Sequence, residues 1–294
     1  MTTTTAASTN TNTQKLLLIE NSSGSPLGST LKWLHDKNIA YDLVKAAEFF
    51  KTIPSNAVEN KPYPISDSYS GIIIGGGGMN VDEESKYPWL ENEKKFIRQN
   101  IAANKKILGL CLGGQLIAEV MGAPVGKHSQ WEAGFYPLEL SYPTSVIPKA
   151  ENIPFLNSQS TSSNTTNKIS KTNSTDIQSK DSSQDSHTTK QQLQQLMAFH
   201  YHGYAFETPP YAMKFASTRC TPNQGFIFKN KVIGLQFHPE TTTEWIQYLV
   251  NDKKSPLPTG PFCQSEASIL DGQSHLPRLQ QWYFQLLENL FNKN

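Results

Sequence analysis

The sequence is poor in cysteine and contains no long apolar run. It has 294 residues but only three cysteines. Such a sparse, odd set argues against a disulfide framework and is typical of a reducing compartment. No apolar stretch reaches the length of a membrane span. The threonine-rich residues 1–14 lack the basic start and apolar centre of a signal peptide. We therefore expect a soluble, cytoplasmic protein that begins with a disordered tail.

An excess of charge of either sign is also missing. Lys and Arg number 26, Asp and Glu number 25, and the formal net charge is +1. No dense block of Lys and Arg occurs, so the sequence predicts neither a nucleic-acid partner nor binding to an acidic membrane surface. The alternating strand and helix patterns described below nevertheless indicate a folded core.

The apolar content is low for a globular chain, at 37%. Residues 157–190 account for part of this, because they are almost wholly Ser, Thr, Asn, Gln, Lys and Asp. Such a segment cannot bury enough apolar surface to offset its chain entropy. The sequence therefore predicts one domain over residues 15–294, with a disordered insert at about 157–190.

Short apolar runs alternate with amphipathic segments along the first part of the chain. This alternation favours an α/β fold with a mainly parallel open sheet and helices on both faces. In such sheets, functional sites form at the carboxyl ends of strands. The expected strands are residues 15–19, 39–44, 69–74, 105–110, 213–217, 225–228 and 231–237, the expected helices are 29–37, 88–103 and 275–294, and 251–266 is an expected loop.

A glycine-rich turn at residues 109–115 (Gly-Leu-Cys-Leu-Gly-Gly-Gln) carries the strongest chemical signal. It follows an expected strand and leads into an apolar, helix-like segment. Gly109 and Gly113 flank Cys111, which is the cysteine form of the G-x-S-x-G elbow, where small neighbours allow a tight bend. The following helix directs its positive N-terminal end at the sulfur, which favours the thiolate. We therefore expect Cys111 to be a reactive nucleophile.

Two further segments follow expected strands. His238 and Glu240, separated by one proline, offer a base and a group that orients it, which a cysteine nucleophile requires. The four glycines of residues 75–78 allow close approach of the backbone to a substrate, and Leu112 N–H at the helix start is a second donor for an oxyanion hole. Residues 75–78 lack the Gly-Lys-Ser/Thr ending of a P-loop, so a phosphate loop is not expected.

Residues 109–115 and 234–240 (Gly-Leu-Gln-Phe-His-Pro-Glu) together resemble the class I glutamine amidotransferase family. Residues 75–90 resemble the oxyanion loop and the helix after it in the stand-alone, GMP-synthase-like branch. The resemblance runs from about residue 16 to residue 245 and is interrupted by the polar insert. It implies a flavodoxin-like sheet.

The resemblance also implies roles for individual residues. It makes Cys111 the nucleophile, His238 the base and Glu240 the third member of a triad. The remaining residues lie along the substrate, with Glu132 near its amino-acid end. These are Gly76, Gly77, Leu112, Gln115 and Glu132.

The implied reaction is hydrolysis of the side-chain amide of glutamine through a cysteinyl thioester. It releases glutamate, and ammonia for a separate acceptor enzyme such as a synthetase subunit. The sequence contains no Ser-Gly-Gly phosphate loop of an ATP-activating domain. No cofactor is expected.

Residues 200–206 (His-Tyr-His-Gly-Tyr-Ala-Phe) resemble the family's His-x-His-Gly-Asp-x-Phe segment, but Tyr204 replaces the acid. A lost acid in the pocket wall changes how the substrate's ammonium is held. An alternative function is therefore that of a γ-glutamyl peptidase or hydrolase acting on γ-glutamyl conjugates. A non-catalytic regulatory subunit is a second alternative, and the intact Cys111, His238 and Glu240 argue against it.

His200 and His202 alternate on one face of an extended segment, which raises the question of a metal pair. No Cys, Asp or Glu at a matching spacing completes such a site. We therefore expect no metal here, and we assign His202 to the substrate pocket.

Overall fold

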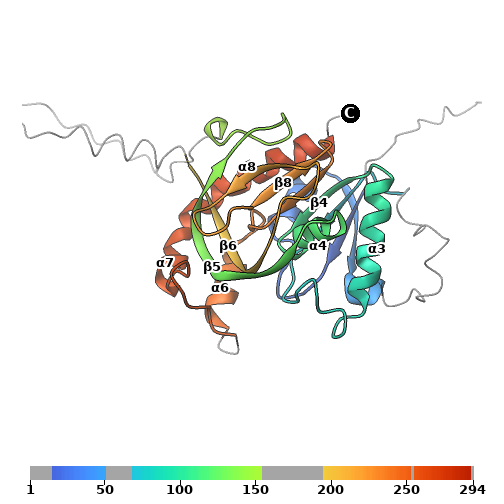
Figure 1. Ribbon diagram of the computed structural model, residues 1–294. Helices are drawn as coiled ribbons and strands as arrows, with labels where there is room; N and C mark the ends of the chain where they lie inside the picture. The colour runs from blue at the N-terminus through green and yellow to red at the C-terminus, as the bar shows by residue number, and fades with distance from the viewer. Residues whose placement is uncertain (1–14, 51–67, 154–194, 253–254, 293–294) are drawn as a thin grey trace, which may run out of the picture.

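A computed structural model of the chain describes residues 15–50, 68–153, 195–252 and 255–292. The expected tail and polar insert lie outside the described residues. The described chain forms a nine-stranded sheet in the order β2-β1-β3-β4-β9-β8-β7-β5-β6 (Figure 1). The strands are β1 (Lys15–Glu20), β2 (Ala40–Lys45), β3 (Gly71–Ile74), β4 (Lys106–Leu110), β5 (Val125–Leu140), β6 (Leu196–Phe206), β7 (Met213–Ser217), β8 (Gly225–Phe228) and β9 (Val232–Leu235).

The sheet has two halves that meet at β9. Strands β2, β1, β3, β4 and β9 are all parallel. Strands β9, β8, β7, β5 and β6 pair antiparallel. The α/β class and the parallel sheet are as expected. The long strand β5 was not expected, because its first half is polar and half-exposed.

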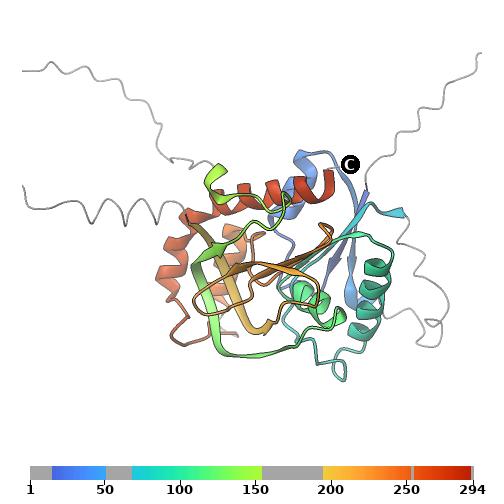
Figure 2. The same cartoon turned by 45° about the horizontal axis from the view of Figure 1, so that its top comes forward.

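Helices cover both faces of the parallel half. The helices are α1 (Ser29–Asp36), α2 (Ala46–Phe49), α3 (Trp89–Ala102), α4 (Leu112–Val120), α6 (Thr243–Asn251), α7 (Glu266–Asp271) and α8 (Leu276–Leu287), with 3-10 turns at Ala150–Asn152 and Gly272–His275 and a π-helical end at Glu288–Asn292. Helix α8 runs across one side of the sheet and α3 lies on the other (Figures 1 and 2).

The apolar run of β1 shows why helices cover both faces of the sheet. Leu16 and Leu18 pack in the core that contains residues of α1 and α8. Leu17 and Ile19 pack in the core that contains residues of α3 and α4. Successive side chains of a strand point to opposite faces, so a continuous apolar run is buried on both.

Helices α6 and α7 pack against β5 and β6 in a third, smaller core. Helix α6 begins at the Thr242 cap, where the side chain accepts a hydrogen bond of 3.3 Å from Trp245 N–H. This helix was not expected from the sequence, and it brings Trp245 to the site described next. In the described residues, no helix is long and apolar enough to cross a bilayer.

Candidate active site

Cys111 occupies a sharp turn between β4 and α4, with φ of 50° and ψ of −105°. A Cβ on Gly113 would overlap the backbone carbonyl of Ile74, and a Cβ on Gly109 would overlap the backbone of Gly113. The two flanking glycines are therefore required by close backbone packing. The strand, turn and helix expected around Cys111 are all present.

The surroundings of the sulfur are polar, although Cys111 is only 7% exposed. Its N–H donates to the Leu235 carbonyl at 2.7 Å, which ties the turn to the end of β9. Gln236 Nε2 approaches Sγ to 3.6 Å. The first turn of α4 begins at the next residue, so its unpaired N–H groups and positive end lie beside the sulfur.

His238 and Glu240 form a buried pair beyond the end of β9. His238 Nδ1 lies 2.7 Å from Glu240 Oε1. The imidazole packs on the Trp245 ring, with the ring centroids 4.8 Å apart. Burial alone lowers the pKa of His238, but the Glu240 carboxylate and the Cys111 sulfur raise this pKa to about 10. The geometry therefore favours an imidazolium between these two groups.

The glycine loop after β3 packs directly on the cysteine and the histidine. The loop is held by Gly75 N–H, which donates to the Ile19 carbonyl at 2.9 Å, and by Asn21 Nδ2, which donates to the Gly75 carbonyl at 3.0 Å. A Cβ on Gly76 would face the His238 ring and the Cys111 Cβ at 3.3 and 3.6 Å. Only a residue without a side chain leaves this contact open.

Two backbone N–H groups near Cys111 are candidate hydrogen-bond donors to a bound substrate. Within the described chain, Gly77 N–H has no hydrogen-bond acceptor. Leu112 N–H lies in the first turn of α4, where N–H groups have no acceptor inside the helix. The arrangement is suited to stabilising negative charge on an oxygen bound next to the sulfur.

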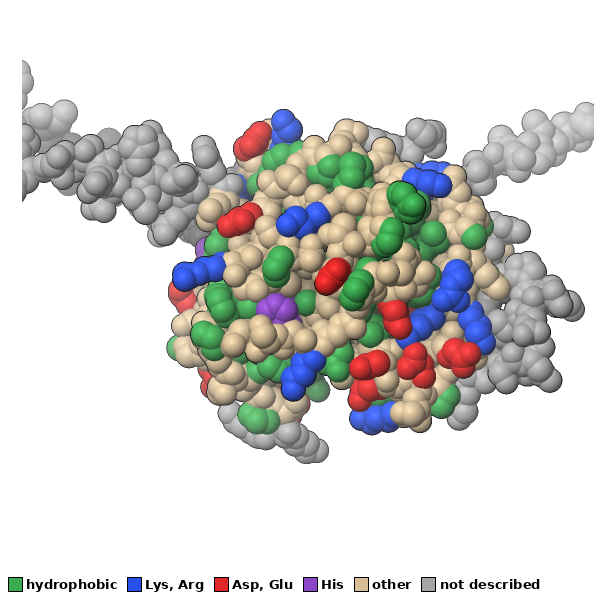
Figure 3. Space-filling view, in the orientation of Figure 1, with side chains coloured by type: hydrophobic (Ala, Val, Ile, Leu, Met, Phe, Trp, Pro, Cys, Tyr) green, Lys and Arg blue, Asp and Glu red, His purple; other side chains and the backbone are tan. Residues whose placement is uncertain are grey.

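These elements surround a cavity of about 260 Å³. The surface is indented at the lower edge of Figure 3. The volume is below the range that drug-sized ligands occupy and suits a ligand the size of an amino acid. The lining comes from the segments that follow β1, β3, β4 and β9 and from β5, β6 and α6. It includes Ser25, Gly77, Cys111, Gln115, Trp131, Tyr201, His202, Tyr204, His238, Trp245 and Tyr248.

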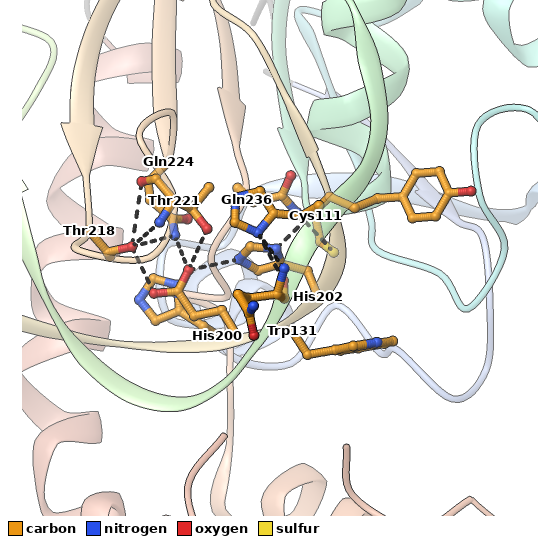
Figure 4. Close-up of polar contacts among 12 residues, drawn as sticks. Cys111, Trp131, His200, His202, Thr218, Thr221, Gln224 and Gln236 are labelled. Atoms are coloured by element: carbon orange, nitrogen blue, oxygen red, sulfur yellow. Dashed lines mark hydrogen bonds and ion pairs between the residues drawn. The ribbon is translucent and has the colours of Figure 1, made fainter. Parts of the chain in front are cut away.

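A chain of amides connects the cavity wall to the sulfur. Gln115 Nε2 donates to the Tyr204 carbonyl at 3.3 Å and to Gln236 Oε1 at 3.2 Å. Gln236 in turn approaches Cys111, and the two lie side by side in Figure 4. Sequence reasoning missed Gln236. A glutamine inside the apolar run of residues 231–237 was the available signal.

Glu132 does not line the cavity. It is fully buried behind the wall. Its Oε1 accepts from Thr218 Oγ1 at 2.7 Å. Its Oε2 accepts from Thr221 Oγ1 at 2.8 Å and from Gln224 Nε2 at 2.7 Å. The role expected for Glu132, beside the substrate's amino-acid end, is therefore not a direct contact in this geometry. Gly76 and Leu112 also lie outside the lining.

The two histidines of β6, labelled in Figure 4, both lie near the carboxylate of Glu132. Glu132 is the register partner of His202. His202 Nε2 lies 3.3 Å from Glu132 Oε2, and His200 Nδ1 lies 3.9 Å from it. Sequence spacing offered no acid to complete a site with these histidines, but the structure brings Glu132 beside them. The acid comes from a distant strand that pairs with β6, so no local spacing could show it.

Comparison with known proteins gives consistent results. The family profile described as Glutamine amidotransferase class-I matches residues 35–252. The chain is 32% identical over 119 residues to the glutamine amidotransferase-like protein YfeJ of Salmonella typhimurium, covering 39% of this chain and 45% of that protein. It is 30% identical over 87 residues to a glutamine-hydrolyzing GMP synthase subunit of Sulfurisphaera tokodaii, covering 30% of this chain and 44% of that protein. The chain thus matches less than half the length of these relatives.

Solved structures share the fold over nearly the whole chain. A glutamine amidotransferase from Thermotoga maritima superimposes with a TM-score of 0.67 at 21% identity, covering 96% of this chain and 99% of that one. One from Methylobacillus flagellatus gives a TM-score of 0.69 at 18% identity, covering 95% and 94% of the two chains. With the family profile spanning most of its length, the chain belongs to the class I glutamine amidotransferase family.

Proposed function

We propose that the protein hydrolyses the side-chain amide of glutamine through a thioester on Cys111, releasing glutamate and ammonia. The observation that carries the proposal is the placement of Cys111 at a strand–helix elbow beside the buried His238–Glu240 pair. A nucleophile, a base and a group that orients the base are the parts that such acyl transfer requires.

The reaction begins with attack of the Cys111 thiolate on the amide carbon of the substrate. Negative charge develops on the amide oxygen, and the N–H groups of Gly77 and Leu112 stabilise it. Removing one donor of this kind costs roughly 3–4 kcal/mol in enzymes that form tetrahedral intermediates. The His238 imidazolium donates its proton to the departing nitrogen, so ammonia leaves and a γ-glutamyl thioester remains.

The thioester is then hydrolysed. His238, now neutral, takes a proton from a water molecule as the water attacks the thioester carbon. The second tetrahedral intermediate collapses, expels the Cys111 thiolate and releases glutamate. Glu240 holds Nδ1 of His238 throughout, so Nε2 is the atom that gives and takes the proton.

The released ammonia has to reach an acceptor enzyme. We propose a separate synthetase subunit, supported by the likeness to a protein named as part of a GMP synthase. The three cysteines are free, which fits a reducing cytoplasm.

A second candidate function is hydrolysis of γ-glutamyl conjugates. The observation that favours it is the aromatic lining of the cavity, to which Trp131, Tyr201, Tyr204 and Tyr248 contribute. An apolar or cationic leaving amine is better held by such rings than ammonia is. The thioester chemistry is the same, and only the leaving group differs.

The test measures product release from glutamine, glutathione and γ-glutamyl amines with the purified full chain, with and without candidate synthetases. Ammonia from glutamine as the fastest reaction supports the first proposal, and faster release of an amine from a conjugate supports the second. In parallel, a glutamine-like electrophile is expected to label Cys111 rapidly.

Cys111→Ala is expected to abolish both turnover and labelling, whereas the matched control Cys220→Ala keeps both. If neither glutamine nor any conjugate is turned over and Cys111 is not labelled, the protein is a regulatory binding subunit instead.

A further inference from the structure

Three side chains of types that commonly ligate metals in proteins meet behind the cavity wall. They are Glu132 of β5 and His200 and His202 of β6. All three are buried, and their ligand atoms lie within 4.8 Å of one another. The proposed glutaminase reaction uses none of the three as a reacting group.

The two histidine rings of this cluster are incompletely paired. By distance and angle, neither ring nitrogen of His200 makes a hydrogen bond within the part of the chain that the structure describes, and Nε2 of His202 is left with its 3.3 Å contact to the Glu132 carboxylate. Buried polar atoms are nearly always paired, because an unpaired one keeps the full cost of its desolvation. The cluster therefore calls for an additional occupant.

The tautomer of His202 points to a cation as that occupant. His202 Nδ1 lies 3.0 Å from the Tyr204 carbonyl, which only accepts, so Nδ1 carries the hydrogen. His202 Nε2 then faces Glu132 Oε2, 3.3 Å away. A cation held between these two atoms would bond to both.

The groups around the three side chains match those that surround bound metals. A histidine ligand typically donates its other ring N–H to a carbonyl or carboxylate, and a carboxylate ligand is itself hydrogen-bonded. His202 has the Tyr204 carbonyl. Glu132 has Thr218, Thr221 and Gln224 (Figure 4). The ligand set is therefore oriented in advance.

We propose that Glu132, His200 and His202 bind one divalent first-row cation, with Zn²⁺ as the best match. Two histidines and one glutamate are a known zinc set, with bonds of about 2.0–2.2 Å. His202 also lines the substrate cavity, so a cation held by the three side chains would lie next to that cavity. The inference is independent of glutamine hydrolysis.

The experiment is a Zn²⁺ titration of metal-stripped, full-length protein against a chromophoric chelator at pH 7.5. It is done in the Cys111→Ala background, because Cys111 and His238 are themselves potential zinc ligands. We expect about one equivalent to bind. Co²⁺ in place of Zn²⁺ is expected to give visible absorption bands typical of nitrogen and oxygen ligands without thiolate.

Adding Glu132→Gln or His200→Gln is expected to weaken Zn²⁺ binding by more than the roughly 10–100-fold that loss of a supporting group costs. The matched control is His128→Gln, which removes a half-buried histidine of β5 outside the cluster and is expected to leave binding unchanged. Circular dichroism checks that each variant is folded. The Co²⁺ spectrum is recorded without any substitution in the cluster, so it does not depend on the folding of those variants. The proposal is overturned if the Cys111→Ala protein binds no stoichiometric Zn²⁺, or binds it equally well without Glu132.

Discussion

The two halves of the sheet build opposite walls of one cavity in different ways. In the parallel half, backbone geometry at the strand ends places the reactive groups, as the turn at Cys111 and the loop at Gly77 show. In the antiparallel half, side chains of paired strands place one another, as Glu132 and His202 do. The first arrangement depends on local backbone geometry, and the second depends on the register between distant strands. Substitutions in the two halves should therefore have different effects.

The largest effect is expected from Gly113→Ala in the parallel half. The added methyl overlaps the Ile74 carbonyl, so the elbow or β3 has to shift. We expect a loss of roughly 3 kcal/mol or more of unfolding free energy, together with loss of turnover. Urea unfolding and ammonia release measure the two.

The matched change in the antiparallel half is Gly126→Ala, where an added Cβ meets nothing within 4 Å. It is expected to change stability by less than roughly 0.5 kcal/mol. Equal destabilisation by the two substitutions would contradict the contrast between the halves.

Glu240→Gln tests the pair at the junction of the halves. The amide cannot stabilise the His238 imidazolium, so we expect turnover to fall on the order of a thousandfold. In the native protein the pKa of His238 is raised to about 10. The stability that this charge contributes is therefore complete below the ordinary pKa of 6.5 and is lost as the pH rises through 10.

The variant lacks the part of that contribution that comes from Glu240. The difference in unfolding free energy between the native protein and Glu240→Gln should therefore shrink between pH 7 and pH 10. A difference that stays constant over this range would show that Glu240 does not act through the charge on His238.

Glu93 of α3 is a test confined to the parallel half. Its carboxyl is fully buried, and burial raises its pKa to about 8 despite opposing effects of Asn21 and Lys94. The folded state therefore holds a proton that the unfolded chain has released between pH 4.5 and 8, so this group lowers stability as the pH rises.

Glu93→Gln removes that dependence. The unfolding free energy of the Glu93→Gln variant, relative to that of the native protein, should increase between pH 5 and pH 8 by on the order of 4 kcal/mol at most. Glu91→Gln, an exposed change on the same helix, is the control and should show no such trend. Chemical unfolding at several pH values gives the answer, and parallel profiles for both variants would refute the assignment.

The smallest effect is expected at Tyr204 of the antiparallel half. Its contacts with Gln115 and His202 run through its backbone carbonyl, so Tyr204→Phe leaves them intact. Hydrolysis of glutamine should change by about twofold or less. A much larger loss of hydrolysis confined to γ-glutamyl amines would show that the phenol contacts the leaving group. It would favour the second candidate function.

What the sequence could predict follows the same division. The apolar run of β1, the helix after it and the elbow are local patterns, and each lies within one or two residues of its expected place. Cys111, His238 and Gly77 could be named because each follows a strand signal closely.

Other features depend on contacts between distant segments. The polar first half of β5 is stabilised by pairing with β6 rather than by its own pattern. The contact of Gln236 with Cys111 is likewise visible only in the folded chain. The meeting of Glu132 with His200 and His202 requires the register of the two strands. No spacing within either segment contains that information.

The backbone of His238 has one more partner, and it bears on whether the last strand of the sheet is open to pairing with another chain. His238 N–H donates to the Phe199 carbonyl of β6 at 2.8 Å, although β9 and β6 stand at opposite ends of the antiparallel half. The half-sheet thus curls toward closure, and a peptide group of the last strand is occupied by the chain's own histidine segment. An open last strand is a template for pairing with another molecule. Here the residue proposed as the catalytic base also helps to block that edge.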